Sequence, residues 1–253
     1  MVIEKYIPGT QNKDAYDALS AMMRDHDVGK SYADMIRLRL NGGAAGQCND
    51  TYYLAREGQK ALSRLWTGWG DHADAIGNWG NFYTDADNRG KGIGGSLLNF
   101  WFADFKGRSD LPRCLLCSAG TKELTELYGK FGFRTAIEGT DHGPLYLPLG
   151  NSPASFREFY NEYYNPSSVL YHRRAMIGYR HEIDCLLKFA LRDLGLEFGI
   201  GDTNSIESAI LYHADRCGML FSEDGHCVGW SMDGVRQVYP LYARSTVVEF
   251  AEN

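Results

Sequence analysis

The stretch "DADNRGKGIGGSLLNF", residues 85–100, places four glycines and two cations directly before an amphipathic run. Glycine lets a ligand approach the backbone, and the start of a helix offers N–H groups together with the positive end of the helix dipole. Arg89 and Lys91 add positive charge among these glycines. Residues of these types in this order predict a turn that binds a phosphate-bearing ligand.

Two common phosphate-binding loops do not fit this stretch. A P-loop needs a Lys followed directly by Ser or Thr, whereas Lys91 is followed by Gly92. The dinucleotide fingerprint G-x-G-x-x-G is matched by Gly90, Gly92 and Gly95, but it belongs at the first strand of a repeated βαβ fold, which this region does not show. A glycine-rich hairpin without a ligand would not require Arg89 and Lys91 beside the glycines.

The pattern Arg89-x-x-Gly92-x-Gly94 resembles the pyrophosphate loop of the GNAT superfamily of N-acetyltransferases. A second stretch, "ELYGKFGF" at residues 126–133, resembles the later Leu-Tyr-x-x-x-Gly-Phe segment of that family. It comes where the family has it, after the next strand and at the end of a helix. The resemblance covers residues 1–150 and is silent beyond them.

The resemblance implies acetyl-CoA as co-substrate and no metal. The amides from Gly90 to Gly95, with Arg89 and Lys91, would hold its pyrophosphate, while the strand "GNFYT" would splay from "RCLLCSA" and offer backbone groups to the pantetheine arm. Tyr128 falls on the family's tyrosine, whose hydroxyl is suited to protonating the departing thiolate. The cofactor-binding residues implied are Phe82, Tyr83, Thr84, Arg89, Gly90, Lys91, Gly92, Ile93, Gly94, Gly95 and Thr121.

Two positions depart from the family pattern. The family commonly has proline three residues before the arginine and asparagine seven before the tyrosine, where this chain has Ala86 and Thr121. Thr121 can cap the following helix and offer a hydroxyl, but an asparagine-type contact to the cofactor does not carry over. Both departures slightly favour the alternative of a module that binds acyl-CoA without turnover.

Amine acetylation also needs a group that removes a proton. A lysine-like amine with a pKa near 10.4 costs roughly 4–5 kcal/mol to deprotonate at neutral pH. No carboxylate lies inside "NWGNFYT", so the candidate bases lie in the flanking loops, and a water relay is equally open. The candidates are Asp71, His72, Asp74, Asp85, Glu138, Asp141 and His142.

The other chemical motifs point to packing. Cys114 and Cys117 form a C-x-x-C on an expected strand, where their side chains would point to opposite faces. Cys217 is expected on an amphipathic helix, and its spacing to the nearby histidines matches no common zinc site. The stretch "HEIDCLLKFALRDLG" lacks the second histidine of H-E-x-x-H and reads as an ordinary apolar stripe.

The elements expected before residue 150 come in the order β-α-α-β-β-β-α-β-α-β-β. The helix after the glycine turn should bury Ile93, Leu97, Leu98, Trp101 and Phe105 on one face, because they recur at helical spacing. An earlier helix, "SYADMIRLRLNGG", should be capped at Ser31. "TYYLARE" and "KALSRLWTGWG" should form two strands around a tight turn at Gly58.

This order fits the fold that the resemblance implies, a GNAT-like α/β fold with a mixed, mostly antiparallel sheet flanked by helices. Two prolines and a glycine in "LPLGNSPAS", residues 147–155, place a boundary between an acetyl-CoA-binding domain at 1–150 and an α+β extension at 151–253. Helices followed by short strands are expected in the extension. Its role stays open between a wall of the acceptor site, a homodimer surface and a worn second GNAT-like copy.

Composition narrows the class of protein. The 253 residues are 44% hydrophobic and 23% charged, which suits a soluble globular protein. No apolar run approaches the roughly 18–20 residues that span a bilayer, and the start "MVIEKYIPGT" has no secretory pattern, so a cytoplasmic location without membrane contact is expected. The net charge of −6 argues against nucleic acid as a partner and suits a cationic acceptor.

The sequence therefore predicts an acetyl-CoA-dependent N-acetyltransferase that acts on a primary amine of a small molecule or peptide by direct attack on the thioester. Two alternatives stay open. One is an inactive acyl-CoA-binding sensor or interaction module. The other is a transferase that acts on a protein or aminoacyl-tRNA amine.

Overall fold

The structure is a computed structural model that describes residues 1–25, 36–164, 169–186, 189, 209–210, 212–232, 235–238 and 247–249. The expected second helix is described over residues 36–40, and its expected cap at Ser31 lies outside the described residues. The stretch "FGIGDTNSIESA", which motivated the second-copy alternative, also lies outside them except for its last residue.

The chain forms two compact units, and each is described by itself. Unit 1 consists of Met1–Asp71 and Gly77–Leu111, and unit 2 of His72–Ile76 and Pro112–Asn253. Strand β7 pairs with β5, and Tyr146 of β7 packs on Phe156 and Phe159 just beyond the expected boundary. These contacts group residues 112–150 with the segment that follows them, while the boundary at 147–155 stays a prediction.

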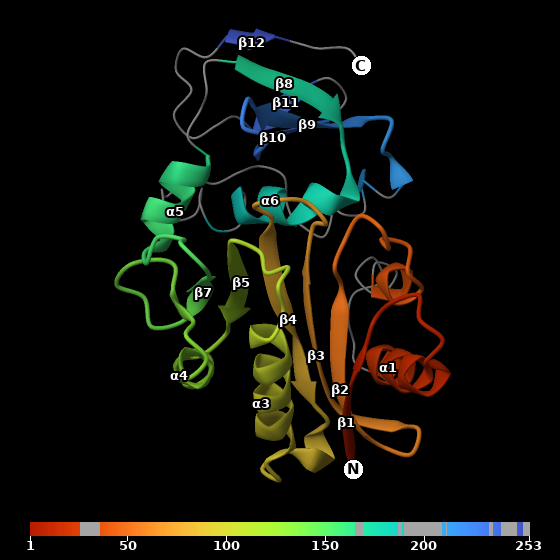
Figure 1. Ribbon diagram of the computed structural model, residues 1–253. Helices are drawn as coiled ribbons and strands as arrows, with labels where there is room; N and C mark the ends of the chain where they lie inside the picture. Colours follow the sequence, from red (N-terminus) through yellow and green to blue (C-terminus); the bar gives the residue numbers. More distant parts are fainter. Residues whose placement is uncertain are drawn as a thin grey trace. The chain divides into compact units, whose positions relative to one another are not determined.

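The described residues of unit 1 form four strands and the helices that cover them (Figure 1). Its strands pair antiparallel in the order β1-β2-β3-β4. The elements are β1 (Val2–Tyr6), α1 (Lys13–Asp25), β2 (Thr51–Glu57), β3 (Lys60–Trp69), β4 (Ile76–Thr84), the short helix η1 (Ala86–Asn88) and α3 (Ile93–Lys106). The β2–β3 hairpin turns at Gly58, whose φ of 56° is the left-handed conformation that glycine adopts at no steric cost.

Alternation along β2 assigns the two faces of this sheet. Tyr52 and Leu54 pack in one cluster with the apolar side of α1, while Ala55 packs with Ile93 at the start of α3. Tyr53, on the same face as Ala55, donates a hydrogen bond to Asp104 of α3 over 2.8 Å. The sheet of unit 1 therefore carries α1 on one face and α3 on the other, because successive side chains of a strand point to opposite sides.

The expected apolar stripe of α3 is confirmed. Its buried residues are Ile93, Leu97, Leu98, Trp101 and Phe105. Trp101 lies 5.4 Å from Trp79 of β4 between ring centroids and 5.6 Å from Phe105. These aromatic contacts fix the helix against the strand that precedes the glycine turn.

The described residues of unit 2 form two groups of antiparallel strands, ordered β5-β7-β6 and β11-β10-β9-β8, with β12 added parallel to β8. Its first elements are β5 (Cys114–Ala119), α4 (Lys122–Gly129), β6 (Arg134–Thr135), β7 (Gly143–Pro148), α5 (Phe156–Tyr163) and β8 (Val169–Arg174). They are followed by η2 (Ile177–Tyr179), α6 (Arg180–Cys185), β9 (Cys217–Ser222), β10 (Cys227–Met232), β11 (Val235–Val238) and β12 (Val247–Glu249).

The expected element order up to residue 150 and the mostly antiparallel fold class are confirmed. Two details of the extension differ from expectation. Strand β8 lies among the helices, where no strand was expected. Cys217 begins β9 instead of lying on a helix, because residues 217–222 pair with both β8 and β10.

Candidate functional site

The candidate site of unit 1 begins with a bulge in β4. Arg64 of β3 pairs with Tyr83 and Trp66 pairs with Gly80, so Asn81 and Phe82 together stand opposite a single residue of β3. Asn81 adopts a φ of 54°, in the left-handed region. A bulge of this kind bends the strand and takes backbone groups out of the ladder.

The bulge also changes which side chains share a face. Trp79 and Phe82 lie 6.0 Å apart between ring centroids, although strict alternation would place them on opposite sides. Phe82 and Thr84 face the first turn of α3, since a Cβ built on Gly94 would contact both. Tyr83 lies on the other face, packed against the cluster formed by α1 and its neighbours. The three residues expected to line the thioester thus divide between the two faces of β4.

Asp85 connects the start of the glycine turn to the β2–β3 hairpin through a hydrogen bond and an ion pair. Its N–H donates to the carbonyl of Leu62 over 2.9 Å, and its carboxylate lies 3.3 Å from the ammonium of Lys60. Asn88 closes η1 by donating from its backbone N–H to the carbonyl of Asp85 over 2.8 Å. The turn therefore leaves β4 along a fixed path before it reaches the glycines.

Three of the glycines meet specific requirements of this turn. Gly90 and Gly92 have φ values of 75° and 76°, and Gly92 is the N-cap of α3. A Cβ on Gly94 would lie 2.9 Å from Thr84 Oγ1 and 3.1 Å from Cζ of Phe82. The left-handed conformation and this close approach both disfavour residues with a side chain, which explains why glycine stands at these three positions.

The turn presents donors and positive charge. The first N–H groups of α3 have no acceptor within the helix, as at every helix start, and the dipole adds positive potential there. Arg89 donates from Nε to the carbonyl of Thr84 over 3.1 Å, and its guanidinium lies 5.6 Å from the ring centroid of Tyr83. Lys91 donates to Asn88 Oδ1 over 3.2 Å. Neither cation forms an ion pair with a carboxylate among the described residues, so both can face an anion.

Tyr128 lies on α4 of unit 2, and Thr121 directly precedes this helix. Thr121 caps the helix, since the N–H of Leu124 donates to Thr121 Oγ1 over 3.3 Å. Tyr128 is 5% exposed and meets Phe133 edge to face. Burial raises the pKa of the Tyr128 hydroxyl, and the nearby Cys117 adds to the rise, so this hydroxyl keeps its proton at neutral pH.

The candidate bases lie in different settings. Asp71 accepts a long hydrogen bond from Asn49, at 3.5 Å, in unit 1. Asp141 and His142 lie 2.6 Å apart on an exposed loop of unit 2, where the hydrogen bond from His142 lowers the pKa of Asp141. Glu138 is exposed in the loop between β6 and β7. Asp85 already pairs with Lys60. Burial raises the pKa of Asp85, but the hydrogen bond and charge of Lys60, with further hydrogen bonds, outweigh burial and lower it.

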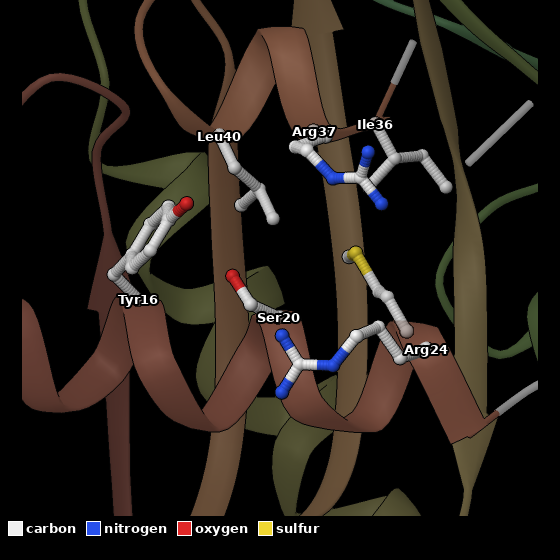
Figure 2. A pocket seen from close by; sticks show the side chains of 7 residues that line it. Tyr16, Ser20, Arg24, Ile36, Arg37 and Leu40 are labelled. Carbon is white, nitrogen blue, oxygen red and sulfur yellow. The ribbon is translucent and has the colours of Figure 1, made fainter. Parts of the chain in front are cut away.

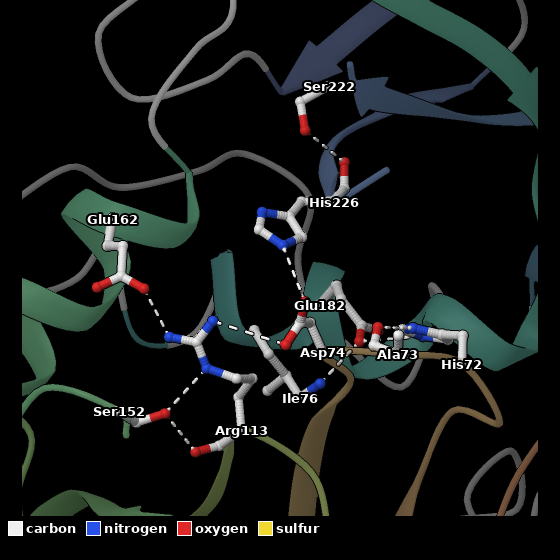
Figure 3. Close-up of polar contacts among 10 residues, drawn as sticks. All are labelled: His72, Ala73, Asp74, Ile76, Arg113, Ser152, Glu162, Glu182, Ser222 and His226. Atoms are coloured by element: carbon white, nitrogen blue, oxygen red, sulfur yellow. Dashed lines mark hydrogen bonds and ion pairs between the residues drawn. The ribbon is translucent and has the colours of Figure 1, made fainter. Parts of the chain in front are cut away.

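His72 and Asp74 belong to a polar network of unit 2 (Figure 3). Glu182 of α6, with a fully buried side chain, accepts a hydrogen bond from the N–H of Ile76 over 2.9 Å and lies 3.4 Å from Nε2 of His72. Nδ1 of His72 lies 2.9 Å from the carbonyl of Ala73, and its ring stacks on Tyr179 at 4.0 Å between centroids. Asp74 lies 3.7 Å from Arg113 and 3.9 Å from His226.

The central residue of this network, Glu182, was missed by the sequence analysis. It stands in "HEIDCLLKFALRDLG", which was interpreted as an apolar stripe. A glutamate beside an apolar stripe is a signal in the sequence that its side chain could be buried. Its partner could not be predicted, because Ile76 lies 106 positions away along the chain. The network holds the residues before β4 to α6 within unit 2.

The pKa of His72 predicts how this network responds to pH. Burial lowers the pKa of His72, but the hydrogen bond and charge of Glu182, with the carbonyls of Ala73 and Gly178, outweigh burial and raise it above 6.5. A raised pKa in the folded state stabilises the protein fully below the unfolded value of about 6.5, and this contribution disappears as pH rises through the folded value. We expect the difference in free energy of unfolding between the parent and His72→Gln to shrink as pH rises.

Urea unfolding of both proteins at a series of pH values measures this difference directly, because contributions from other titrating groups cancel. A difference that stays constant, or that grows toward alkaline pH, would contradict the assignment of a charged His72 to Glu182.

Other candidate chemistry is absent from the described part of the chain. No group of three or more His, Cys, Asp or Glu side chains there is arranged to hold a metal ion. Cys114 and Cys117 are both buried free thiols, and burial raises their pKa values. None of the described helices combines the length and apolar character that a membrane crossing requires.

Comparison with known proteins gives one family match. Residues 48–135 match the family described as acetyltransferase (GNAT) domain. No curated protein sequence matches this chain. The matched segment contains β2, β3, β4, the glycine turn, α3, β5 and α4, which are the elements described above.

Three similar solved structures have low sequence identity to this chain. ElaA of Escherichia coli is 14% identical with a TM-score of 0.45, covering 58% of this chain and 99% of ElaA. An acyl-CoA N-acyltransferase of Pseudomonas aeruginosa is 18% identical with a TM-score of 0.42, covering 58% and 98%. A GNAT family acetyltransferase of Brucella melitensis, solved in complex with acetyl-CoA, is 16% identical with a TM-score of 0.42, covering 61% and 92%.

Proposed function

We propose that this chain transfers the acetyl group of acetyl-CoA to a primary amine of a small molecule or peptide, because residues 48–135 match the family described as acetyltransferase (GNAT) domain. The acceptor amine attacks the thioester directly, without a covalent intermediate on the protein. Residues 1–150 bind the co-substrate in this proposal, and residues 151–253 form an extension that walls the acceptor site or provides a homodimer surface.

The observation that carries the proposal is the glycine turn at the end of β4. Left-handed Gly90 and Gly92 shape a turn whose amides lead into the first turn of α3, and Arg89 and Lys91 stand beside them without carboxylate partners among the described residues. A pyrophosphate carries two negative charges and several acceptor oxygens, so it suits aligned N–H donors flanked by two cations. The turn therefore fits the pyrophosphate of acetyl-CoA.

The bulge in β4 supports a role in holding the rest of the co-substrate. Asn81 and Phe82 together stand opposite a single residue of β3, so the regular pairing of β4 is interrupted beside the glycine turn, where the pantetheine arm would lie in this proposal. Phe82 and Thr84 lie on the same face as the glycine turn, since both approach Gly94. We propose that the side chains of Phe82 and Thr84 contact the ligand, whereas Tyr83 contacts the guanidinium group of Arg89.

Acetyl-CoA supplies an activated acyl group with a thiol as leaving group. Tyr128 is the residue proposed to donate a proton to that thiolate. Its raised pKa makes it a weak acid, so it acts late, when negative charge has built up on the sulfur. The proton of the amine goes to water or to one of the candidate bases, and the acidic charge balance of the chain favours a cationic acceptor.

Thiol release with a panel of primary amines tests this proposal, using the parent, Tyr128→Phe and the control Tyr212→Phe. Tyr212 is 59% exposed, so its hydroxyl can be removed without loss of packing. We expect the parent to release thiol with at least one amine, and Tyr128→Phe to lower kcat by about 10²-fold, the lower limit for loss of a general acid. The control should match the parent.

The alternative is an acyl-CoA-binding module without turnover, which Ala86 and Thr121 slightly favour as departures from the family pattern. Binding of acetyl-CoA with no thiol release for any amine would support this module and contradict the transferase. Release that is unaffected by Tyr128→Phe would keep the transferase and remove Tyr128 from the reaction.

A further inference from the structure

Two guanidinium groups of unit 1 lie over one aromatic ring, that of Tyr83 near the end of β4. Cζ of Arg64 lies 5.3 Å from the centroid of this ring, and Cζ of Arg89 lies 5.6 Å from it. An aromatic ring attracts a cation that lies over its face within about 6 Å of the centroid. Tyr83 is therefore a contact point for Arg89, which the proposed function places beside the pyrophosphate of acetyl-CoA.

The ring of Tyr83 is itself held in place on the face of the sheet that α1 covers. Tyr83 pairs with Arg64 of β3 and packs against the buried cluster that includes Met22 and Leu54. Arg64 is only 2% exposed, so the guanidinium on that side of the contact is enclosed by protein. Side chains in such close-packed surroundings keep one rotamer. The ring thus offers Arg89 a surface of fixed position.

A hydrogen bond to the end of β4 adds a second restraint on Arg89. Its Nε donates to the carbonyl of Thr84 over 3.1 Å. Fully buried Ser63 fixes the backbone at this point, because its Oγ donates to the carbonyl of Tyr83 over 3.0 Å and lies 3.0 Å from Thr84 Oγ1. Within the described residues, Arg89 uses Nε and the face of its guanidinium, which leaves the N–H groups of both Nη atoms for an anion.

This restraint matters because Arg89 is exposed. An exposed arginine without contacts occupies many rotamers and loses that freedom when it binds a ligand. Immobilising one such side chain lowers affinity by about two- to tenfold. Contacts with Tyr83 and Thr84 remove part of the freedom before the ligand arrives, so they favour binding.

We propose that Tyr83 is a positioning residue, which holds the guanidinium of Arg89 in the orientation that binds the pyrophosphate. The proposal rests on the proposed function, in which the glycine turn binds acetyl-CoA. It gives Tyr83 a role on the face of β4 opposite Phe82 and Thr84, where its own side chain does not touch the co-substrate. Tyr83 acts on affinity through Arg89 alone.

A double-mutant cycle, measured by calorimetric titration of acetyl-CoA, tests this proposal. It compares the parent, Tyr83→Leu, Arg89→Ala and the protein with both changes. We expect Arg89→Ala to weaken binding by about tenfold, through loss of a charge-assisted hydrogen bond. Tyr83→Leu should weaken binding by about two- to fivefold when Arg89 is present, the range for an exposed cation–π contact, and should have no effect when Arg89 is absent. Tyr83→Phe keeps the ring and should bind like the parent.

Tyr16→Leu is the matched control for the loss of a tyrosine ring. Tyr16 and Tyr83 are both partly buried and pack against the same cluster. Tyr16 belongs to α1, where it lines a pocket together with Ile36 and Leu40 (Figure 2). Its ring contact is with Tyr6, at 6.3 Å between centroids. The control therefore makes the same change in the same cluster away from Arg89, and it should leave the affinity for acetyl-CoA unchanged.

Several outcomes would overturn the positioning role. They are unchanged or tighter binding in Tyr83→Leu, equal losses from this change with and without Arg89, an equal loss in Tyr16→Leu, and a loss in Tyr83→Phe as large as in Tyr83→Leu. Each of these results, with a parent that binds acetyl-CoA, contradicts this proposal and leaves the proposed function in place. A parent that does not bind acetyl-CoA contradicts both.

Discussion

Replacing Gly94 with valine is expected to weaken acetyl-CoA binding by at least about tenfold, the effect of losing one charge-assisted hydrogen bond to the pyrophosphate. The added Cβ would lie 2.9 Å from Thr84 Oγ1, and Thr84 is itself held 3.0 Å from Ser63 Oγ. The first turn of α3 must therefore move away from β4. That movement displaces the N–H groups which, in the proposed function, face the pyrophosphate.

The matched control for this prediction is Asn99→Val. Asn99 lies on the exposed face of the same helix, so the control adds the same side chain to α3 without a contact to β4. Overpacking costs about 1–3 kcal/mol, so circular dichroism should first confirm that Gly94→Val is folded at the temperature of the titration. Equal affinity of the folded Gly94→Val variant and the parent would contradict the role of the close approach at Gly94.

Replacing Glu182 with alanine is expected to lower the free energy of unfolding by about 3–5 kcal/mol, the usual cost of removing one partner of a buried ion pair. Glu182 is fully buried, and its loss leaves the N–H of Ile76 without its acceptor and the imidazole of His72 without its counter-charge. Glu182→Gln should recover part of the loss, since an amide oxygen can still accept from Ile76.

Glu162→Ala is the matched control for that prediction. Glu162 also pairs with a cation, Arg113, at 2.6 Å, but its side chain is 55% exposed. Exposed pairs contribute about 0.2–1 kcal/mol, so chemical denaturation should separate the two variants clearly. Similar losses in both variants would mean that burial of Glu182 does not control the stability of unit 2.

The sequence predicted those parts of the molecule that follow from local spacing. The buried stripe of α3 could be predicted because the five apolar residues recur at helical spacing, and the glycine turn because its residue types are rare together outside phosphate-binding loops. The cap at Thr121 also followed from its position before a helical run. These features require no knowledge of distant contacts.

The features that the sequence did not predict depend on pairing between distant residues. The bulge at Asn81 depends on how β4 pairs with β3, which the stretch "GNFYT" does not reveal by itself. The sequence therefore predicted that Phe82, Tyr83 and Thr84 all line the thioester. Strand β8 and the strand position of Cys217 depend on pairing across more than forty residues. Glu182 contacts Ile76 and His72 in its buried position, and both residues are far from it in the sequence.

The central claim is that the glycine turn binds acetyl-CoA, and equilibrium binding tests it most directly. Acetyl-CoA and desulfo-CoA would be titrated by calorimetry into the parent, into Arg89→Ala/Gly92→Ala and into Arg134→Ala/Gly139→Ala. The last protein is the matched control, because it makes the same two changes away from the glycine turn. Arg134 is exposed, and Gly139 has open space around it. The φ of Gly139, 79°, is close to the 76° of Gly92. The account predicts that the parent and the control bind both ligands and that the Arg89 and Gly92 changes abolish binding. A parent that binds neither ligand, or an Arg89→Ala/Gly92→Ala protein that binds as tightly as the control, would contradict it.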